Sequence, residues 1–281
     1  MPVSSRVYTE TDVETFFDQT LNNYLSFWDS QGALHTGYFA GEGDHDYQAA
    51  QQRTSDMLAA DAGIDESSYV LDVGCGCGNF LIHLAENFGC RGEGLDLSEE
   101  RIRFAQKLAG DNPRIQFRHA SATQMPYEPD RFTHVVSQDA LCLVPDKERS
   151  HTEIFRVLRP GGVFAFSDFL QPQEAISERA RKHVYDRVRW NGGYSLVGYQ
   201  AALEVAGFEI LLARNLGNHL KQTYRVLGKT AQERSQTASE DAAREWMLAF
   251  SASCKEIQVA IDDREFGWGM IVARKPASAR S

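Results

Sequence analysis

The sequence of 281 residues has no long hydrophobic run, and no apolar stretch approaches the roughly 20 residues that a helix needs to cross a bilayer. Its N-terminus, MPVSSRVYTETDVETFF, has neither the basic segment nor the apolar segment of a secretory signal. These absences predict a soluble, cytoplasmic protein without a membrane partner.

Cysteine and basic side chains are also scarce. The five cysteines are odd in number and scattered, which does not indicate a disulfide framework. Lys and Arg total 29 against 39 Asp and Glu, for a formal net charge of -10. Because Lys and Arg supply most of the affinity for a phosphate backbone, this balance argues against a nucleic-acid partner. Internal repeats and low-complexity linkers are absent too, so we expect one domain over residues 1–281. Monomer and homo-oligomer both stay open.

Short apolar segments alternate with amphipathic ones in the first two thirds of the chain. This pattern predicts βαβ units, and hence a parallel sheet with helices on both faces. The predicted strands cover residues 68–73, 90–97, 114–120, 132–138, 163–169, 208–216 and 266–274. The predicted helices cover residues 10–28, 46–62, 79–89, 98–110, 147–159, 174–190, 196–205 and 219–262.

The stretch VLDVGCGCGNF (70–80) places Gly74, Gly76 and Gly78 directly after the first predicted strand and before a helix. Glycines there let the backbone approach a nucleotide closely, and the helix N-terminus supplies free N–H groups. Asp96 ends the next strand, about 20 residues past the loop, where an acid grips the hydroxyls of a ribose. Together these features predict an adenosine-type cofactor at the carboxyl edge of the sheet.

Cys75 and Cys77 alternate with these glycines. A metal site would need further ligands at suitable spacing, which the neighbouring sequence does not offer. A disulfide across so short a span would be strained. We therefore predict no metal, and interpret both cysteines as small side chains under the bound cofactor.

Asp72, two residues before the first glycine, would repel a pyrophosphate but suits a cofactor with a positive amino group. The resulting D-x-G-x-G-x-G pattern resembles motif I of class I S-adenosylmethionine-dependent methyltransferases. The segments LDLS (95–98), ATQMPY (122–127) and VLRPGGVFAFSD (157–168) are similar to later motifs of that family and follow in the same order.

The resemblance implies a Rossmann-like, doubly wound α/β sheet of seven strands, the last one antiparallel. It implies S-adenosylmethionine as cofactor and S-adenosylhomocysteine as product. Asp72 and the glycines would face the methionine moiety, and Asp96 with Leu97 the ribose. Ser121 and Ala122 would contact adenine, although many members carry an acid at the position of Ser121.

Three further segments, HTGYF (35–39), SQDA with the following PD, and FGWGMIVARKP, resemble small-molecule methyltransferases. The type is that of the glycine/sarcosine/dimethylglycine and phosphoethanolamine N-methyltransferases. This similarity implies a helical lid over residues 1–62, a cofactor-binding core over 68–170 and a final strand over 266–275. The substrate would lie under a helical cap formed by residues 171–205 and 217–262.

The polar groups that we expect nearest to the transferred methyl group are Gln138, Asp139 and Asp168, with Gln138 also touching the cofactor. If the acceptor needs a base, His35, His219 and Asp168 are the candidates. Leu143 stands where the amine methyltransferases commonly have a histidine, which makes the pocket more apolar.

Two arginines and a set of aromatic residues are further candidates for the acceptor side. Arg187 and Arg189 would match a carboxylate or phosphate bidentately, with a solvated helix face as the other interpretation. Aromatic rings could hold the sulfonium or a cationic amine by cation–π contact, or could equally belong to the core. They are Tyr24, Trp28, Tyr38, Tyr194, Tyr224 and Trp268.

The sequence thus predicts an enzyme that methylates a small molecule, most simply an amine. C- or O-methylation of an isoprenyl diphosphate or another natural-product intermediate is one alternative. A non-catalytic cofactor-binding sensor or partner subunit is another. An RNA or protein methyltransferase is disfavoured by the acidic balance and by the large cap, which suits the enclosure of a small ligand.

Overall fold

A computed structural model describes residues 7–27 and 31–277. Seven strands form one sheet in the order β3-β2-β1-β4-β5-β7-β6. They are β1 Tyr69–Val73, β2 Arg91–Asp96, β3 Ile115–His119, β4 Phe132–Gln138, β5 Leu158–Leu170, β6 Glu209–Asn215 and β7 Gly267–Arg274. Neighbouring strands from β3 to β5 are parallel, and β7 runs antiparallel to both β5 and β6. The predicted α/β sheet with an antiparallel last strand is confirmed.

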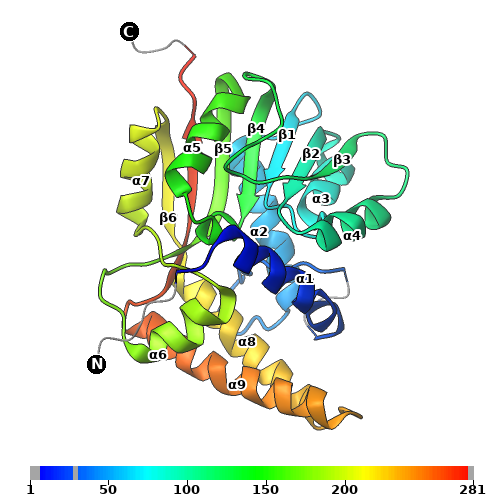
Figure 1. Ribbon diagram of the computed structural model, residues 1–281, viewed down its shortest axis with the longest axis vertical. Coiled ribbons are helices and arrows are strands. Elements are labelled where there is room, and N and C mark those ends of the chain that lie inside the picture. The colour runs from blue at the N-terminus through cyan, green and yellow to red at the C-terminus, as the bar shows by residue number, and fades with distance from the viewer. Residues whose placement is uncertain (1–6, 28–30, 278–281) are drawn as a thin grey trace.

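The principal helices include one set on each face of the sheet and a group at its carboxyl end (Figure 1). They are α1 Glu10–Phe27, α2 Tyr47–Ala62, α3 Asn79–Phe88, α4 Glu99–Ala109, α5 Lys147–Val157, α7 Leu196–Val205, α8 Gly217–Ser235 and α9 Asp241–Asp262. The short α6 Glu178–Ala180 continues into a π turn, Arg181–Tyr185, and a 3-10 turn, Asp186–Val188. None of the described helices is both long enough and apolar enough to cross a membrane.

The core has two layers, one on each face of the sheet. Side chains of α2 and α3 pack on one face, around Val70, Val136 and Ala165. Those of α5 and α7 pack on the other, around Phe164 and Phe166. Alternate residues of each strand enter opposite layers, as the pleat of a strand requires. Each large side chain that is fully buried here contributes roughly 1.5–3 kcal/mol.

Two helical predictions differ from the structure. Residues 174–190 form only short turns rather than one helix. The predicted helix over 219–262 is two helices, α8 and α9, because residues 236–240 (QTASE) leave the helical path. Ser and Thr there compete for backbone hydrogen bonds and are weak helix formers. The break lets α9 pack back against α8, as Figure 1 shows.

Strand order creates an opening at the centre of the sheet. From β1 the chain proceeds outward through β2 to β3, whereas β4 and β5 lie on the other side of β1. A crevice forms at the carboxyl ends of the strands where the order reverses in this way. Helix α1 lies across this edge (Figure 1), whereas α2 packs against the sheet. Within the described part of the predicted 1–62 lid, α1 and residues 32–35 thus border the crevice, whereas α2 lies against the sheet.

Candidate active site

The loop from β1 to α3 is built by its glycines. φ is 73° at Gly74, 54° at Gly76 and 83° at Gly78, a left-handed conformation that other residues adopt only at a cost. A Cβ at Gly74 would collide with the Cβ of Ala140. The backbone at Gly74 and Gly76 lines a cavity, whereas Gly78 packs closely against the side chain of Phe117.

Asp72 lies on β1 with 2% of its surface exposed, and its Oδ2 atom has no hydrogen-bond partner in the described part of the chain. Its side chain lines the same cavity as the glycine loop. Burial, with a smaller contribution from the charge of Asp96, raises the pKa of Asp72 to about 8. An ammonium group in this cavity would supply both the missing hydrogen bond and the opposite charge.

Asp96 ends β2 and connects the glycine loop to the start of α4. Its Oδ2 atom accepts from the N–H of Gly76 at 2.9 Å, and its Oδ1 atom accepts from the N–H of Ser98 at 2.8 Å. Ser98 in turn caps α4 by accepting from the N–H of Arg101. Asp96 is partly exposed and retains lone pairs for the hydroxyls of a ligand.

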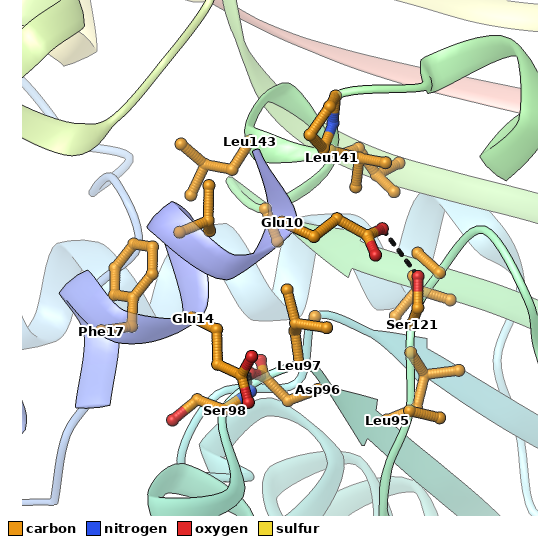
Figure 2. A pocket seen from close by; sticks show the side chains of 18 residues that line it. Glu10, Glu14, Phe17, Leu95, Asp96, Leu97, Ser98, Ser121, Leu141 and Leu143 are labelled. Atoms are coloured by element: carbon orange, nitrogen blue, oxygen red, sulfur yellow. Dashed lines mark hydrogen bonds between the residues drawn. The ribbon is translucent and has the colours of Figure 1, made fainter. Parts of the chain in front are cut away.

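Two cavities adjoin at this edge of the sheet. The first lies between α1 and the ends of β2 and β3 (Figure 2). The second lies between the glycine loop and residues 32–35. Five lining residues are common to both: Phe17, Gly74, Asp96, Ala140 and Leu143. The shared walls make the cavities two parts of one elongated site.

The residues predicted to contact the cofactor meet here. All except Gly78 line one of the two cavities: Asp72, Gly74, Gly76, Asp96, Leu97, Ser121, Ala122 and Gln138. Arg101, which the sequence did not single out, also lines the second cavity, and its guanidinium carbon lies 4.5 Å from the centroid of the Phe17 ring. The second cavity therefore holds a carboxyl group, Asp72, and a cation, Arg101. An ammonium group beside Asp72 would favour its ionised form, so the two side chains match the zwitterionic end of an amino acid.

Asp139 follows β4 in the left-handed conformation, with a φ of 53°. Its carboxylate accepts from the N–H of Thr36 at 2.6 Å, the hydroxyl of Ser167 at 2.7 Å and the indole N–H of Trp268 at 2.7 Å. These three donors engage both oxygens of the carboxylate. The geometry makes Asp139 an anchor that ties residue 36 to β5 and β7.

Asp168 lies on the opposite face of the sheet from Ser167. It is fully buried, its Oδ2 atom accepts from the hydroxyl of Tyr199, and burial raises its pKa to about 6. Tyr194 lies on the same side, with its ring centroid 5.0 Å from that of Tyr199. Neither Asp168 nor Tyr194 is among the described residues that line the two cavities.

The two candidate histidines differ in position. His35 lines the second cavity, and its Nε2 atom lies 3.1 Å from the carbonyl oxygen of Gln51, so this nitrogen carries the proton. His219 accepts from the N–H of Phe39 through Nδ1 at 3.1 Å and stacks on Tyr38 with ring centroids 4.1 Å apart. Burial lowers the pKa of His219, and its neutral ring carries the proton on Nε2.

The two arginines predicted to bind the acceptor, and those of the remaining predicted aromatic side chains that are described, line neither cavity: Arg187, Arg189, Tyr38, Tyr224 and Trp268. Arg187 donates to the hydroxyl of Tyr224 at 2.9 Å. Arg189 donates to the carbonyl oxygen of Asp186 at 2.6 Å. Trp268 is fully buried as the partner of Asp139. The side chain of Tyr24 and all of Trp28 lie outside the described residues.

Cys75 and Cys77 line the second cavity, as predicted for residues under the cofactor. Within the described residues, no group of three or more His, Cys, Asp and Glu side chains could hold a metal ion.

Comparisons with known proteins find methyltransferases similar to this chain. Residues 70–162 match a family model described as a methyltransferase domain. The chain is 30% identical over 215 residues to the sarcosine/dimethylglycine N-methyltransferase of Halorhodospira halochloris, covering 75% of each chain. It is 29% identical over 252 residues to the 27-O-demethylrifamycin SV methyltransferase of Amycolatopsis mediterranei, covering 86% of this chain and 90% of the relative.

A solved structure shares the fold. Geranyl diphosphate C-methyltransferase from Streptomyces coelicolor A3(2), in complex with Mg²⁺, geranyl diphosphate and S-adenosylhomocysteine, superposes with a TM-score of 0.75 at 15% identity. The match covers 98% of each chain.

The residues present fit S-adenosylmethionine. The unpartnered carboxylate oxygen of Asp72 suits the amino group, Arg101 suits the carboxylate, and Asp96 suits the ribose hydroxyls. Apolar side chains of the first cavity, Leu97 and Leu141 among them, suit the flat faces of a base. When bound, the cofactor supplies a methyl group on a sulfonium. On the site and on its relatives, the chain belongs to the S-adenosylmethionine-dependent methyltransferases and is an enzyme that transfers a methyl group to a small molecule.

Proposed function

We propose that the acceptor is the neutral nitrogen of a small amine. The observation that carries this proposal is that neither candidate carboxylate, Asp139 or Asp168, is placed to act as a base in the second cavity. Asp139 accepts three hydrogen bonds, and Asp168 lies on the far face of the sheet. An uncharged amine has its lone pair available already, so its methylation needs alignment and not a strong base.

In the proposed reaction, a bond forms from the amine nitrogen to the methyl carbon while the carbon–sulfur bond breaks. The electron pair of the broken bond stays on sulfur, and the methylated ammonium releases its proton to water. The protein holds the two reactants in line. Asp72 and Asp96 bind the cofactor side, Gln138 and His35 line the cavity beside it, and Leu143 excludes water.

The relative from Halorhodospira halochloris supports an amine acceptor, because its name specifies N-methylation of sarcosine and dimethylglycine. The test is incubation with a trideuteromethyl cofactor and separate pools of amines and amino acids, prenyl diphosphates, and hydroxylated aromatics. Mass spectrometry should find the label on nitrogen in the amine pool. Asp96→Ala serves as the control, because it removes the ribose ligand. Labelling confined to another pool would refute the amine proposal.

O-methylation of an acceptor with an apolar body is the second candidate, and Leu143 is the observation that favours it. Its side chain lines both cavities, at a position where the resemblance to the amine methyltransferases implies a histidine. The relative from Amycolatopsis mediterranei supports this candidate, because its name gives 27-O-demethylrifamycin SV as the compound that it methylates. A hydroxyl acceptor needs a base, for which His35 is the group at the cavity wall.

The variant His35→Gln separates the two candidates. Glutamine keeps a donor for the carbonyl oxygen of Gln51 but removes the imidazole. Transfer to an amine should then keep its rate within about threefold, whereas transfer to a hydroxyl should fall by about 100-fold, the usual contribution of a general base. The measurement is the kcat of His35→Gln and of the unaltered protein, each with the acceptor identified in the preceding experiment.

A further inference from the structure

The first cavity has an unexpected source of negative charge. After β3, where the resemblance described above implies an acid beside adenine, this chain has Ser121. The structure places a carboxylate at the same point from a distant part of the sequence, since Glu10, the first residue of α1, lines the cavity opposite Ser121 (Figure 2).

Two hydroxyl groups hold this carboxylate. The Oε1 atom of Glu10 accepts from the hydroxyl of Ser121 at 2.7 Å and from that of Thr123 at 3.2 Å. Ser121 is fixed in turn, because its Oγ atom accepts from the N–H of Thr123 at 3.0 Å. Both bonds from the loop end on Oε1, so the other carboxylate oxygen keeps its capacity to accept.

The position of Asp96 defines which end of the ligand reaches Glu10. A ribose bound at Asp96 would lie at the end of β2, and the first cavity continues from there toward β3 and residues 120–122. The base therefore occupies the part of the cavity that Glu10 and Ser121 border. The edge of adenine carries one exocyclic donor, the 6-amino group, and a carboxylate is the acceptor that binds it most strongly.

We propose that Glu10 is the acceptor for the 6-amino group of the cofactor's adenine, so that α1 supplies the recognition group that β3 lacks. Ser121 and Thr123 position the carboxylate. This inference concerns the cofactor alone and is independent of which acceptor is methylated.

The N-terminal segment before Glu10 is itself anchored. The N–H of Tyr8 donates to Oδ1 of Asn191 at 2.7 Å, and the side-chain amide of Asn191 donates back to the carbonyl oxygen of Tyr8 at 2.7 Å. Asn191 belongs to the segment between the short helical turns and α7. Adenine recognition through Glu10 thus depends on a contact between the N-terminus and the predicted cap.

The test compares S-adenosylhomocysteine with S-inosylhomocysteine by calorimetry, with no methyl acceptor present. Inosine replaces the 6-amino donor with an oxygen, which a carboxylate repels. Glu10→Gln should weaken binding of S-adenosylhomocysteine by about 10- to 100-fold, the range for a hydrogen bond to a charged group. The Glu10→Gln variant should bind S-inosylhomocysteine at least as tightly as the unaltered protein does, because the amide of glutamine can donate to the 6-oxygen of the base.

Three further variants sharpen the result. Asp12→Asn makes the same change of charge on the same helix, at a residue whose Oδ2 atom bonds the N–H of Thr9, and it should leave both affinities unchanged. Glu10→Asp keeps the charge with a shorter reach and should give an intermediate loss. Ser121→Ala should weaken S-adenosylhomocysteine in the unaltered protein but add little in the Glu10→Gln background, because the two side chains act as one unit.

Equal losses for the two nucleosides in Glu10→Gln would overturn the proposal, since they would indicate a role in seating α1 only. Unchanged affinities would overturn it as well. Should Glu10→Gln fail to fold, as thermal unfolding would reveal, the ratio of the two affinities in Ser121→Ala and Glu10→Asp decides by the same criterion.

Discussion

At the scale of single residues, Asp72 joins cofactor binding to the pH dependence of folding. Burial raises its pKa to about 8, whereas an unfolded aspartate titrates near 3.9. Between these values the native state binds more protons than the unfolded state, so the free energy of unfolding falls as pH rises. Asp72 therefore destabilises the free protein increasingly from about pH 4 upward, and in full above about pH 8.

We predict that Asp72→Asn stabilises the free protein and weakens its ligand binding. At pH 8 its Tm should exceed that of the unaltered protein, by about 2–4 °C for each kcal/mol relieved, and the difference should shrink toward pH 5. Binding of S-adenosylhomocysteine should weaken by about tenfold, because one charge-assisted hydrogen bond is lost. Thermal scans at several pH values and calorimetry measure both effects. A Tm difference that does not grow with pH would contradict the assignment.

Asp96 offers a second prediction at this scale. Asp96→Ala should weaken binding of S-adenosylhomocysteine by more than about tenfold, because the ribose hydroxyls lose a charged acceptor. Asp96→Asn keeps an oxygen for only one of the N–H groups of Gly76 and Ser98, because these bond different carboxylate oxygens. It still offers a polar group to the ribose and should lose less than Asp96→Ala. Calorimetry on both variants, with circular dichroism as the control for folding, tests this. Equal affinities in Asp96→Ala and the unaltered protein would show that the ribose binds elsewhere.

At the scale of elements, Asp139 joins three parts of the chain at one carboxylate: residue 36, β5 and β7. Both donors from the sheet, Ser167 and Trp268, bond Oδ1, and the donor from the N-terminal segment, Thr36, bonds Oδ2. One oxygen of Asp139 therefore binds the sheet, and the other binds the N-terminal segment.

An asparagine at position 139 can keep only one of these sets. Its oxygen can still accept from Ser167 and Trp268, but its amide nitrogen would face the N–H of Thr36, donor against donor. We predict that Asp139→Asn loses about 1–3 kcal/mol of stability and that exchange of the Thr36 amide hydrogen speeds up by about tenfold or more. Amide exchange followed by mass spectrometry checks this. Protection of Thr36 equal to that in the unaltered protein would refute the division of roles.

The elements that the sequence predicted well are those set by local chemistry. Apolar strands, the capped helix after Ser98 and the turn through Gly74 and Gly76 depend on residues close in sequence, and the structure has them. Glu10 and Arg101 could not be found in that way, because their place at the cavity depends on how α1 and α4 pack. Asp168 is a different case, since alternation along β5 puts it on the face of Phe164 and Phe166, opposite Ser167.

At the scale of the whole molecule, the five cysteines differ in their distance from the site, so their alkylation rates can show where a ligand binds. All are free and buried. Within the described residues, Cys75 and Cys77 line the second cavity, whereas Cys90, Cys142 and Cys254 line neither cavity. Burial raises the pKa of the Cys75 thiol well above its ordinary value. Alkylation of this thiol, which requires the thiolate, therefore needs an alkaline buffer.

We predict that S-adenosylhomocysteine slows alkylation of Cys75 and Cys77 more than it slows alkylation of the other three. The ligand covers the first two directly, and it affects the others only by stabilising the fold as a whole. Peptide mass spectrometry after timed alkylation gives each rate in one experiment, with Cys90, Cys142 and Cys254 as internal controls. Uniform slowing of all five would place the ligand away from the glycine loop.

The pairing of β6 with β7 has a consequence for protein engineering. Asn215 and Gly269 are partners across these antiparallel strands, and the N–H of Leu216 donates to the carbonyl oxygen of Trp268 at 2.8 Å. Residues 216–266, with α8 and α9, thus leave the sheet and return to it at neighbouring points. Because its ends are neighbours, we expect that a corresponding segment from a relative can be grafted between these two points without a change in strand register. A set of such chimeras would vary the helices while the cofactor-binding strands stay constant.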